Sequence, residues 1–495
     1  MLLERTWSGG GHTRKIRQCA VAGSFYPADA AELAETVDNL LLRAAMPPLE
    51  NVVAITAPHA GYGYSGPVAA CSYASVKGHR FDRVVVIAPS HFAAFKFSSV
   101  YNGAAYLTPL GEIPVDREFA AKLAQMSPSI QLSSMGHARS PGRAEHALEV
   151  QLPFLQRALG KFRLVPVIAG DQSYDCSHAL GAALAKLAGA NTLIVASSDL
   201  SHYHPSDEAV VLDRKTLRAI EEYDYFNLAR NLEMRVWEAC GGGPIVAAMI
   251  AAERLGATGA RLLRYDHSGD TSGDYSHVVG YGAVAFVRSA GDQTGEEALS
   301  LSEVEKSVLL EIARRSVGTA VRERKRYECS AWGQEALTQE RAAFVTLTRH
   351  GQLRGCMGCA APVKPLHTAV RDVATMAALK DPRFEPITAA EVPELEYEIS
   401  VLSPLRRVRD MREIRIGVHG LLIHNSGHEG LLLPQVAGKA NWDRATFLEQ
   451  ICRKAGLPAH AWQDPATDLF RFTALVFGEP RPEQSPPQRT GSAGA

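Results

Sequence analysis

Short runs of apolar, β-branched residues alternate with longer Ala-rich stretches from about residue 16 to residue 288. Such runs, bounded by turn residues, are typical of strands, and the Ala-rich stretches between them are typical of helices. Strands that alternate with helices along a chain usually form a parallel sheet that the helices cover. The pattern therefore predicts an α/β domain over residues 16–288, with a mostly parallel sheet and helices on both of its faces.

The pattern changes after residue 288. A polar, Gly-containing segment at residues 289–295 predicts a linker over residues 289–300. Ser302 and Glu305 have capping-box spacing, which predicts a long helix that runs to about residue 325. The following elements mix without strict alternation, so we expect an α+β domain over residues 301–479. Its expected elements are strands at 342–348, 395–402 and 470–477, a hairpin at 418–433, and helices at 365–379 and 442–455.

Composition and charge narrow the class of protein. The formal net charge is −1 and no apolar run reaches spanning length, so neither nucleic acid nor a membrane is an expected partner. The eight cysteines are scattered, with only Cys356 and Cys359 close together, and a reducing cytoplasm is the expected compartment. Residues 1–15 lack the apolar stretch of a secretory signal. Those residues and the polar tail at 480–495 are expected to be disordered.

Three predicted strands of the first domain are each followed by candidate chemical groups. The runs at 52–55, 84–87 and 193–195 lead to His59, to His91, and to Asp199 with His202. In an open α/β sheet, ligands collect beyond the carboxyl ends of the strands. Core packing does not require such a repetition, so these side chains predict one shared site.

Two further segments add candidates. Cys240 precedes a Gly-Gly-Gly-Pro turn and a predicted helix, whose dipole would favour a thiolate. It is a metal ligand, a nucleophile, or a small residue packed under the turn. His146 and Glu149 share a face if their segment is helical, which makes them candidate ligands, supporting partners of ligands, or an acid/base pair. His137 and His178 show no link to this site and are interpreted as surface residues.

Short motifs over residues 16–288 resemble the Memo family in their order and spacing. They are Ala57-Pro58-His59-Ala60-Gly61-Tyr62, Pro89-Ser90-His91, Glu145-His146, Ser197-Ser198-Asp199 and Cys240-Gly241. That family is similar in fold to the class III extradiol dioxygenases, which cleave catechols with iron(II). The metal ligands implied by the resemblance are His59, His91 and Cys240. The pocket residues that it implies are His146, Asp199 and His202. Cys240 would supply a thiolate where those dioxygenases use a carboxylate, which leaves Cu or Zn as alternatives to Fe(II).

The second domain resembles the AMMECR family over about residues 301–479. The supporting motifs include Leu353-Arg354-Gly355-Cys356-Met357-Gly358, Asp381-Pro382-Arg383-Phe384 and Gly430-Leu431-Leu432-Leu433-Pro434-Gln435. The segment 354–358 is either a backbone nest for an anion, with Arg354 and Cys356 facing a substrate, or a tight turn that needs its glycines. The family pattern requires only the first cysteine, so Cys359 is expected to be incidental.

Together the two halves resemble the B and A proteins of the AmmeMemoRadiSam system, whose third member is a radical SAM enzyme. The CxxxCxxC cluster motif of such enzymes is absent from this sequence, so a separate radical SAM protein is the expected partner. Fusion keeps the two modules at high effective concentration, which favours a shared substrate or partner.

Three functions stay open at this point. The first is a non-haem iron enzyme, with His146 or His202 as general acid/base and Asp199 orienting a histidine. The second is a metal-binding or peptide-binding scaffold without turnover. The third is a metal-free hydrolase in which Cys240 is the nucleophile and a histidine is its partner.

Overall fold

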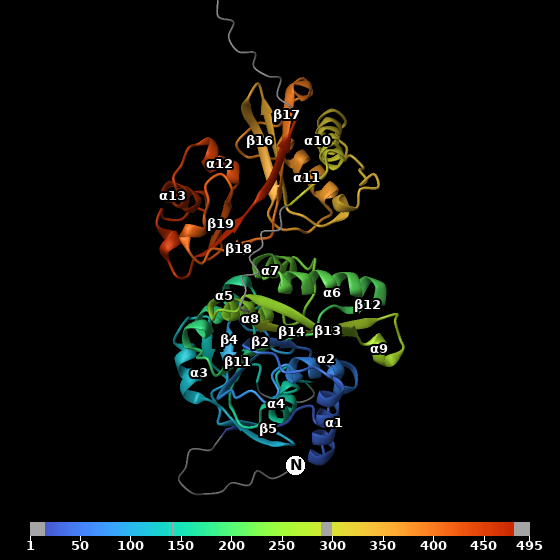
Figure 1. Cartoon of the computed structure of the whole chain (residues 1–495), viewed down its shortest axis with the longest axis vertical. Helices are drawn as coiled ribbons and strands as arrows, with labels where there is room; N and C mark the ends of the chain where they lie inside the picture. Colours follow the sequence, from blue (N-terminus) through green and yellow to red (C-terminus); the bar gives the residue numbers. More distant parts are fainter. Residues whose placement is uncertain (1–14, 138, 141–142, 289–298, 480–495) are drawn as a thin grey trace, which may run out of the picture. The chain divides into compact units, whose positions relative to one another are not determined.

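The structure is a computed structural model that describes residues 15–137, 139–140, 143–288 and 299–479 (Figure 1). The chain divides into two compact units, Met1–Gly295 and Glu296–Ala495. The predicted disordered start, linker and tail lie outside the described residues, apart from Lys15 and residues 299–300. Each unit has its own core and is described by itself.

The first unit alternates strands and helices along most of its length. Its strands are β1 (Ile16–Arg17), β2 (Val52–Ala57), β3 (Arg83–Pro89), β4 (Ser98–Val100), β5 (Ala105–Thr108), β6 (Gly111–Pro114), β7 (Ile130–Leu132), β8 (Arg139–Ser140), β9 (Arg143–Ala144), β10 (Arg163–Ala169), β11 (Thr192–Ser197), β12 (His202–His204), β13 (Gly259–His267) and β14 (Val278–Val287). Its helices are α1 (Ala30–Arg43), α2 (Tyr62–Ala74), α3 (Arg117–Ala124), α4 (Gln151–Leu159), α5 (Tyr174–Leu187), α6 (Ser206–Glu221), α7 (Tyr225–Glu233), α8 (Gly242–Arg254) and α9 (Gly269–Ser272).

A nine-stranded sheet forms the centre of this unit. Its strand order is β12-β14-β2-β11-β3-β10-β4-β7, and β13 pairs with β14 outside this path. The four strands β2, β11, β3 and β10 are parallel to one another, and the antiparallel strands β14 and β4 flank them. The mostly parallel α/β sheet expected from the sequence is confirmed.

The central strands are buried on both faces. All residues of β2 and β11 are buried, as are all residues of β3 and β10 after the first. Continuous apolar strands of this kind need a cover on each side. Helix α8 packs across β2, β3 and β11, while α1, α2 and α4 contribute to the core on the opposite face. Polar groups can therefore reach a site only beyond the ends of these strands.

The second unit is an α+β arrangement of two antiparallel sheets, as expected. The sheet orders are β16-β15-β17-β22 and β18-β21-β19-β20. The strands are β15 (Ala343–Arg349), β16 (Gln352–Cys359), β17 (Leu395–Leu402), β18 (Arg406–Arg407), β19 (Gly420–Asn425), β20 (His428–Leu432), β21 (Asp468–Phe472) and β22 (Ala474–Gly478). The helices are α10 (Glu303–Glu323), α11 (Leu366–Leu379), α12 (Pro434–Lys439) and α13 (Arg444–Lys454). Figure 1 shows α10 and α11 beside β16 and β17, with α12 and α13 in the other lobe.

The capping box of this unit was predicted correctly from local sequence patterns, whereas one predicted strand was wrong. Ser302 caps α10 in a capping box with Glu305, as predicted. The single strand predicted at residues 470–477 is wrong, because β21 and β22 belong to different sheets. The chain crosses between them at Thr473, whose backbone N–H donates to Ser403 Oγ (2.9 Å). Residues of both strands pack against apolar cores. The apolar pattern of the sequence is therefore not interrupted at Thr473, and it does not indicate that the chain passes from one sheet to the other.

The glycines of segment 354–358 serve packing within a strand. The segment lies in β16, so it is neither a backbone nest nor a tight turn. A Cβ at Gly355 would overlap the carbonyl oxygen of Ala377 in α11, and one at Gly358 would overlap the ring of Phe344. Close approach of a helix and of an aromatic ring therefore explains why glycine stands at both positions.

No helix among the described residues combines the length and the apolar character that a membrane crossing requires.

Replacement of Gly355 by alanine is expected to lower the free energy of unfolding of the second unit by about 1–3 kcal/mol, because the backbone of α11 must shift. Denaturant unfolding of the full chain, resolved for the second unit, measures this change. Gly318→Ala in α10 is the matched control, since no atom lies near the added methyl group. The control is expected to be neutral or stabilising by up to about 1 kcal/mol. Equal stability of Gly355→Ala and wild type would contradict this packing.

Candidate metal centre

Three neighbouring parallel strands deliver the candidate groups to one edge of the sheet. The order β2-β11-β3 places the ends of these strands side by side, with Ala57 opposite Ser197. His59 follows β2, Asp199 follows β11 and His91 follows β3. The ring centroids of His59 and His91 lie 5.2 Å apart. The structure thus brings together the side chains that the sequence pattern singled out.

Cys240 reaches the same place from the start of α8. Gly241 is the N-cap of this helix, and a Cβ there would overlap the carbonyl oxygen of Ser197. Only glycine lets the helix start approach the end of β11 so closely. Cys240 Sγ lies 3.1 Å from His59 Nε2. The ligand atoms of His59, His91 and Cys240 all lie within 4.8 Å of one another.

The hydrogen bonds of Ser197 fix the tautomer of His59. Ser197 Oγ donates its one proton to the carbonyl of Ala147 (2.7 Å) and accepts from the Gln151 Nε2 amide (2.8 Å). It must therefore accept, not donate, in its 2.9 Å contact with His59 Nδ1. His59 then carries its proton on Nδ1, which leaves the Nε2 lone pair facing Cys240.

Glu145 performs the same task for His91. Its Oε1 accepts from His91 Nδ1 (3.0 Å), and its Oε2 accepts from the His91 backbone N–H (2.6 Å). Metal-binding histidines commonly donate their second N–H to a carboxylate in this way. Burial alone would lower the pKa of His91, but the hydrogen bond and charge of Glu145 outweigh it, so the pKa is raised.

A second group of possible ligands, His91, Glu145 and His146, overlaps the first. Glu145 Oε1 also accepts from the backbone N–H groups of His146 (2.9 Å) and Ala147 (3.0 Å). With four donors already on its two oxygens, Glu145 is better suited to holding His91 than to binding a metal itself. The set His59, His91 and Cys240 is therefore the better candidate.

The surroundings of Cys240 in the absence of a metal favour its neutral thiol. The helix dipole by itself would favour a thiolate at this position. Burial, together with the nearby Asp199 carboxylate, raises the pKa of Cys240 well above its usual range. These effects outweigh the hydrogen bonds from the Asp199 and Gly241 backbones. The thiol can donate to the Nε2 lone pair of His59, whose pKa burial holds well below the usual value.

Asp199 lies against His59 but does not orient an imidazole. Its Oδ1 accepts from the His59 backbone N–H (2.7 Å), and its Oδ2 is 4.0 Å from His59 Nε2. Burial raises the pKa of this carboxyl group to about 7. The orienting role that we expected from Asp199 falls instead to Ser197 and Glu145.

His146 and His202 both lie beside the candidate ligands. The His146 ring stacks on His91 with centroids 5.1 Å apart, and burial lowers its pKa to about 4. His202 Nδ1 lies 2.9 Å from the Leu200 carbonyl oxygen. Because a carbonyl oxygen only accepts, Nδ1 carries the proton and donates it. Burial also lowers the pKa of His202. Both imidazoles are therefore neutral near pH 7.

Glu149 belongs to a different network. It forms a buried ion pair with Arg17 and accepts from the Tyr26 hydroxyl and from the backbone N–H of Ala20 and Val21. Arg17 in turn donates to the Glu145 carbonyl (2.6 Å). Glu149 therefore anchors the segment before α1 to the segment that carries Glu145 and is no ligand or acid/base partner of His146.

Two histidines interpreted as surface residues are buried. His137 is 1 % exposed, and its ring contacts the Tyr106 hydroxyl and the Ser99 carbonyl. His178 is 9 % exposed, on the inner side of α5. His178 stands four residues after Tyr174 and three before Gly181, both buried, so the helical periodicity of α5 could have indicated its burial.

Arg354 and Cys356 of the second unit are held in different surroundings. Arg354 is paired with Glu391 (2.8 Å) and donates to the Glu385 carbonyl (2.8 Å). Cys356 is half-buried beside Thr346. Cys359 lies on the core side of β16, against the apolar cluster beneath α11, which fits the expectation that it is incidental.

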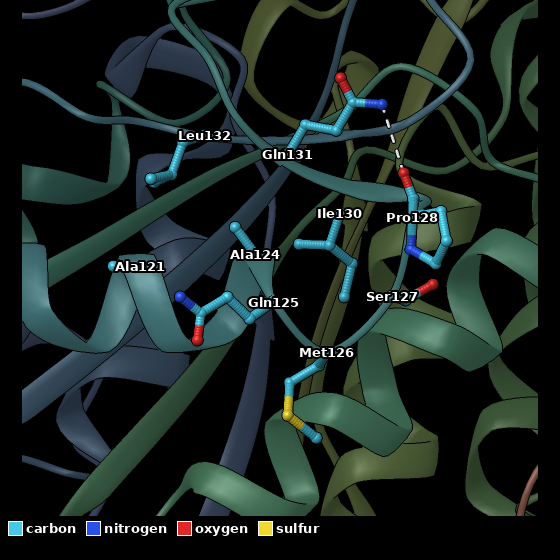
Figure 2. A pocket seen from close by; sticks show the side chains of 9 residues that line it. All are labelled: Ala121, Ala124, Gln125, Met126, Ser127, Pro128, Ile130, Gln131 and Leu132. Atoms are coloured by element: carbon cyan, nitrogen blue, oxygen red, sulfur yellow. Dashed lines mark hydrogen bonds between the residues drawn. The ribbon is translucent and has the colours of Figure 1, made fainter.

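Two pockets on the surface of the first unit differ in whether their lining residues contact the candidate metal centre. Figure 2 shows a pocket between α3 and β7 that no ionisable side chain lines; its lining residues are Ala121, Ala124, Gln125, Met126, Ser127, Pro128, Ile130, Gln131 and Leu132. A second hollow lies between α1 and the segment 23–27, and Phe25 lines it. The Phe25 ring is 4.6 Å from the His146 ring. This second hollow therefore adjoins the candidate metal centre, whereas the first has no chemistry to offer.

Comparison with known proteins matches a different family to each unit. The Memo-like protein family matches residues 17–285, and AMMECR1 matches residues 310–477. A MEMO1 family protein of Nitrosopumilus maritimus is 38 % identical over 279 residues, which cover 55 % of this chain and 100 % of the relative. A MEMO1 family protein of Methanobrevibacter smithii is 37 % identical over 285 residues, which cover 55 % of this chain and 99 % of that protein.

Among solved structures, the uncharacterized protein PH0010 from Pyrococcus horikoshii is 34 % identical, with a TM-score of 0.36, over 36 % of this chain and 93 % of that chain. The family matches fall on separate parts of the sequence, one in each compact unit. The chain therefore belongs to the Memo-like protein family through its first unit and carries an AMMECR1 domain in its second.

Proposed function

We propose that the Memo-like unit is a non-haem metal centre, in which His59, His91 and Cys240 hold Fe(II). We further propose that the protein uses this centre in redox modification of a small molecule or protein. One observation carries the proposal: the three ligand atoms lie within 4.8 Å of one another. Both histidines also use their other ring nitrogen in hydrogen bonds that aim Nε2 at the centre.

The donor set fits a divalent transition metal. Two imidazoles and a thiolate suit iron, and they also suit copper and zinc, so metal analysis decides among the three. Three protein ligands leave further coordination positions for a substrate. When bound, such a metal supplies Lewis acidity, and iron adds one-electron redox chemistry.

The surrounding residues bind, shield and move protons. His146 and His202 are the proposed general acid/base groups, since both are neutral imidazoles beside the ligands. Asp199 is proposed to act with them from its position next to His59. Phe25 covers the outer side of His146 and limits access of water to it. A substrate would reach these groups from the hollow that Phe25 lines.

Partnership with a separate radical SAM protein is part of this proposal. Its support is the union of a Memo-like unit and an AMMECR1 domain in one chain that lacks a CxxxCxxC motif. Such a partner would supply radical chemistry that this chain has no cofactor motif to perform.

Metal-free hydrolysis by Cys240 has less support. A nucleophilic cysteine needs a thiolate, whereas burial keeps this thiol protonated. Its neighbour His59 is a weak base, because burial holds the pKa of its ring well below the usual value. A scaffold role would be favoured if the protein holds a metal and shows no turnover.

Purification without oxygen is expected to give wild-type protein with about one iron per chain, and the variants His59→Ala and Cys240→Ala without it. Metal analysis by mass spectrometry measures this. His277→Ala is the control, because His277 is exposed and its hydrogen bond goes to the neighbouring Ser276. Wild-type protein that is free of metal and resists reconstitution with Fe(II), Cu or Zn would overturn the proposal.

Glu145→Gln is expected to weaken metal binding by about 10-fold to 100-fold. The neutral amide has one acceptor oxygen, so it cannot accept on two oxygens from His91 Nδ1 and the His91 backbone N–H as the carboxylate does. Competition with a chromophoric chelator gives the affinity. Glu118→Gln removes an exposed carboxylate that pairs only with Lys122 and should leave the affinity unchanged. Equal affinities for both variants would show that Glu145 does not support the centre.

Metal affinity is expected to rise with pH. Burial raises the pKa of Cys240, and Glu145 raises that of His91, so binding must displace protons from these groups. Each displaced proton increases the apparent affinity by about tenfold per pH unit. Titrations between about pH 6 and pH 8 measure the slope. Cys240→His, whose imidazole is largely deprotonated in that range, should give a shallower slope. An affinity that is independent of pH would argue against a thiolate ligand.

A further inference from the structure

A serine, a histidine and an aspartate outside the candidate metal centre form a chain of contacts in the first unit. His267 is the last residue of β13, and its side chain is buried. Its Nε2 lies 2.8 Å from Oγ of Ser206, the first residue of α6. Its Nδ1 lies 3.2 Å from Oδ2 of Asp270 in α9. A hydroxyl, an imidazole and a carboxylate therefore stand in the order that activates a serine as a nucleophile.

The carboxylate of Asp270 decides which ring nitrogen of His267 carries the proton. Its Oδ2 also accepts from the His267 backbone N–H at 2.9 Å, which holds the carboxylate beside the ring. An ionised carboxylate only accepts, so Nδ1 carries the proton and Nε2 turns its lone pair to Ser206. The contact at Nδ1 is too bent for a full hydrogen bond. Catalytic hydrogen bonds are often poorly aligned without substrate and tighten when it binds.

Ser206 differs from two other serines that contact an imidazole in the described part of the chain. Ser197 Oγ gives its proton to a backbone carbonyl (2.7 Å), and Ser276 Oγ gives its proton to Asp274 (2.6 Å). The hydroxyl of Ser206 has His267 Nε2 as its acceptor. A base thus stands ready to take the Ser206 proton, whereas the protons of the other two are committed elsewhere.

The hydroxyl of Ser206 is held in place near the surface. The Ser206 backbone N–H donates to the Tyr275 carbonyl (3.0 Å). The Tyr275 ring meets the His267 ring edge-on, with centroids 5.7 Å apart. Ser206 is half-buried, while Asp270 and Tyr275 are exposed. The three groups therefore lie where a small molecule can approach them from the solvent.

The first turn of α6 offers donors for a developing negative charge. The helix begins at Ser206, and no side chain caps it. Among the described residues, no acceptor binds the backbone N–H groups of Asp207 and Glu208. Such N–H groups at a helix start can stabilise the oxyanion that forms when a serine attacks a carbonyl. The side chains of both residues are exposed carboxylates, which would repel an anionic substrate.

We propose that Ser206, His267 and Asp270 form a catalytic triad that hydrolyses small, uncharged carboxylic esters. Ser206 Oγ attacks the carbonyl carbon as His267 Nε2 takes the hydroxyl proton. The bond to the leaving oxygen breaks, the proton moves from His267 to that oxygen, and the acyl group stays on Ser206. Water then attacks the acyl carbon and gives a proton to His267. The carboxylic acid leaves as Ser206 regains its proton.

Labelling of the full chain with a biotin-tagged fluorophosphonate tests the proposal, because this reagent reacts with a serine that a neighbouring base activates. Wild-type protein is expected to carry the label on Ser206, and peptide mass mapping locates it and gives the rate. His267→Gln should slow the labelling of Ser206 by about 100-fold, since the base is lost. Wild-type protein without label on Ser206, or a rate that His267→Gln leaves unchanged, would refute the triad.

Two further variants guard against a change of fold at the buried His267. Asp270→Asn alters an exposed side chain and should also slow the labelling, because an amide no longer selects the ring with its proton on Nδ1. His277→Gln makes the matched change at an exposed histidine and should leave the rate unchanged. Equal rates for Asp270→Asn and His277→Gln would show that the carboxylate plays no part.

Hydrolysis of 4-nitrophenyl acetate then measures turnover. Ser206→Ala is expected to slow it at least about tenfold, with the remaining rate due to other nucleophiles of the chain. The triad needs no metal, so EDTA should leave the wild-type rate unchanged. This activity is therefore independent of the proposed metal centre, and either can fail without the other. Turnover that EDTA abolishes, or that is equal in Ser206→Ala and wild type, would count against the triad.

Discussion

The burial of the central parallel strands on both faces is the constraint on which the first unit depends. These strands are buried along their whole length and mostly apolar, so the functional groups gather at or just beyond their last residues. The order β2-β11-β3 then decides which of those residues meet. The candidate ligands meet because three neighbouring strands, β2, β11 and β3, end at the same edge of the sheet.

That constraint also explains how much could be read from the sequence. The strands, their parallel arrangement and the convergence of His59, His91 and Asp199 follow from local patterns and one rule about sheet edges. Cys240 was placed correctly at a helix start, but its protonation state depends on burial by distant segments, which no local pattern contains. The same holds for Glu149, whose partners lie more than a hundred residues away in the sequence.

The groups that sequence reasoning missed share a physical property. Ser197 and Glu145 act through hydrogen bonds to the far nitrogen of an imidazole, and a hydroxyl or carboxylate with that role looks like any other polar residue in the sequence. In the sequence, Ser197 and Glu145 stood out only as members of the short motifs that resemble the Memo family. In the second unit, the glycines of β16 were conspicuous, but only the position of α11 explains them.

The hydrogen bonds that hold His59 and His91 are made entirely by the protein. The orientation of these rings is therefore set when the chain folds, and loss of a metal removes no interaction that defines their positions. Under the proposed function, a metal ion would enter a site whose two imidazoles are already oriented, so binding would cost little further ordering of these side chains.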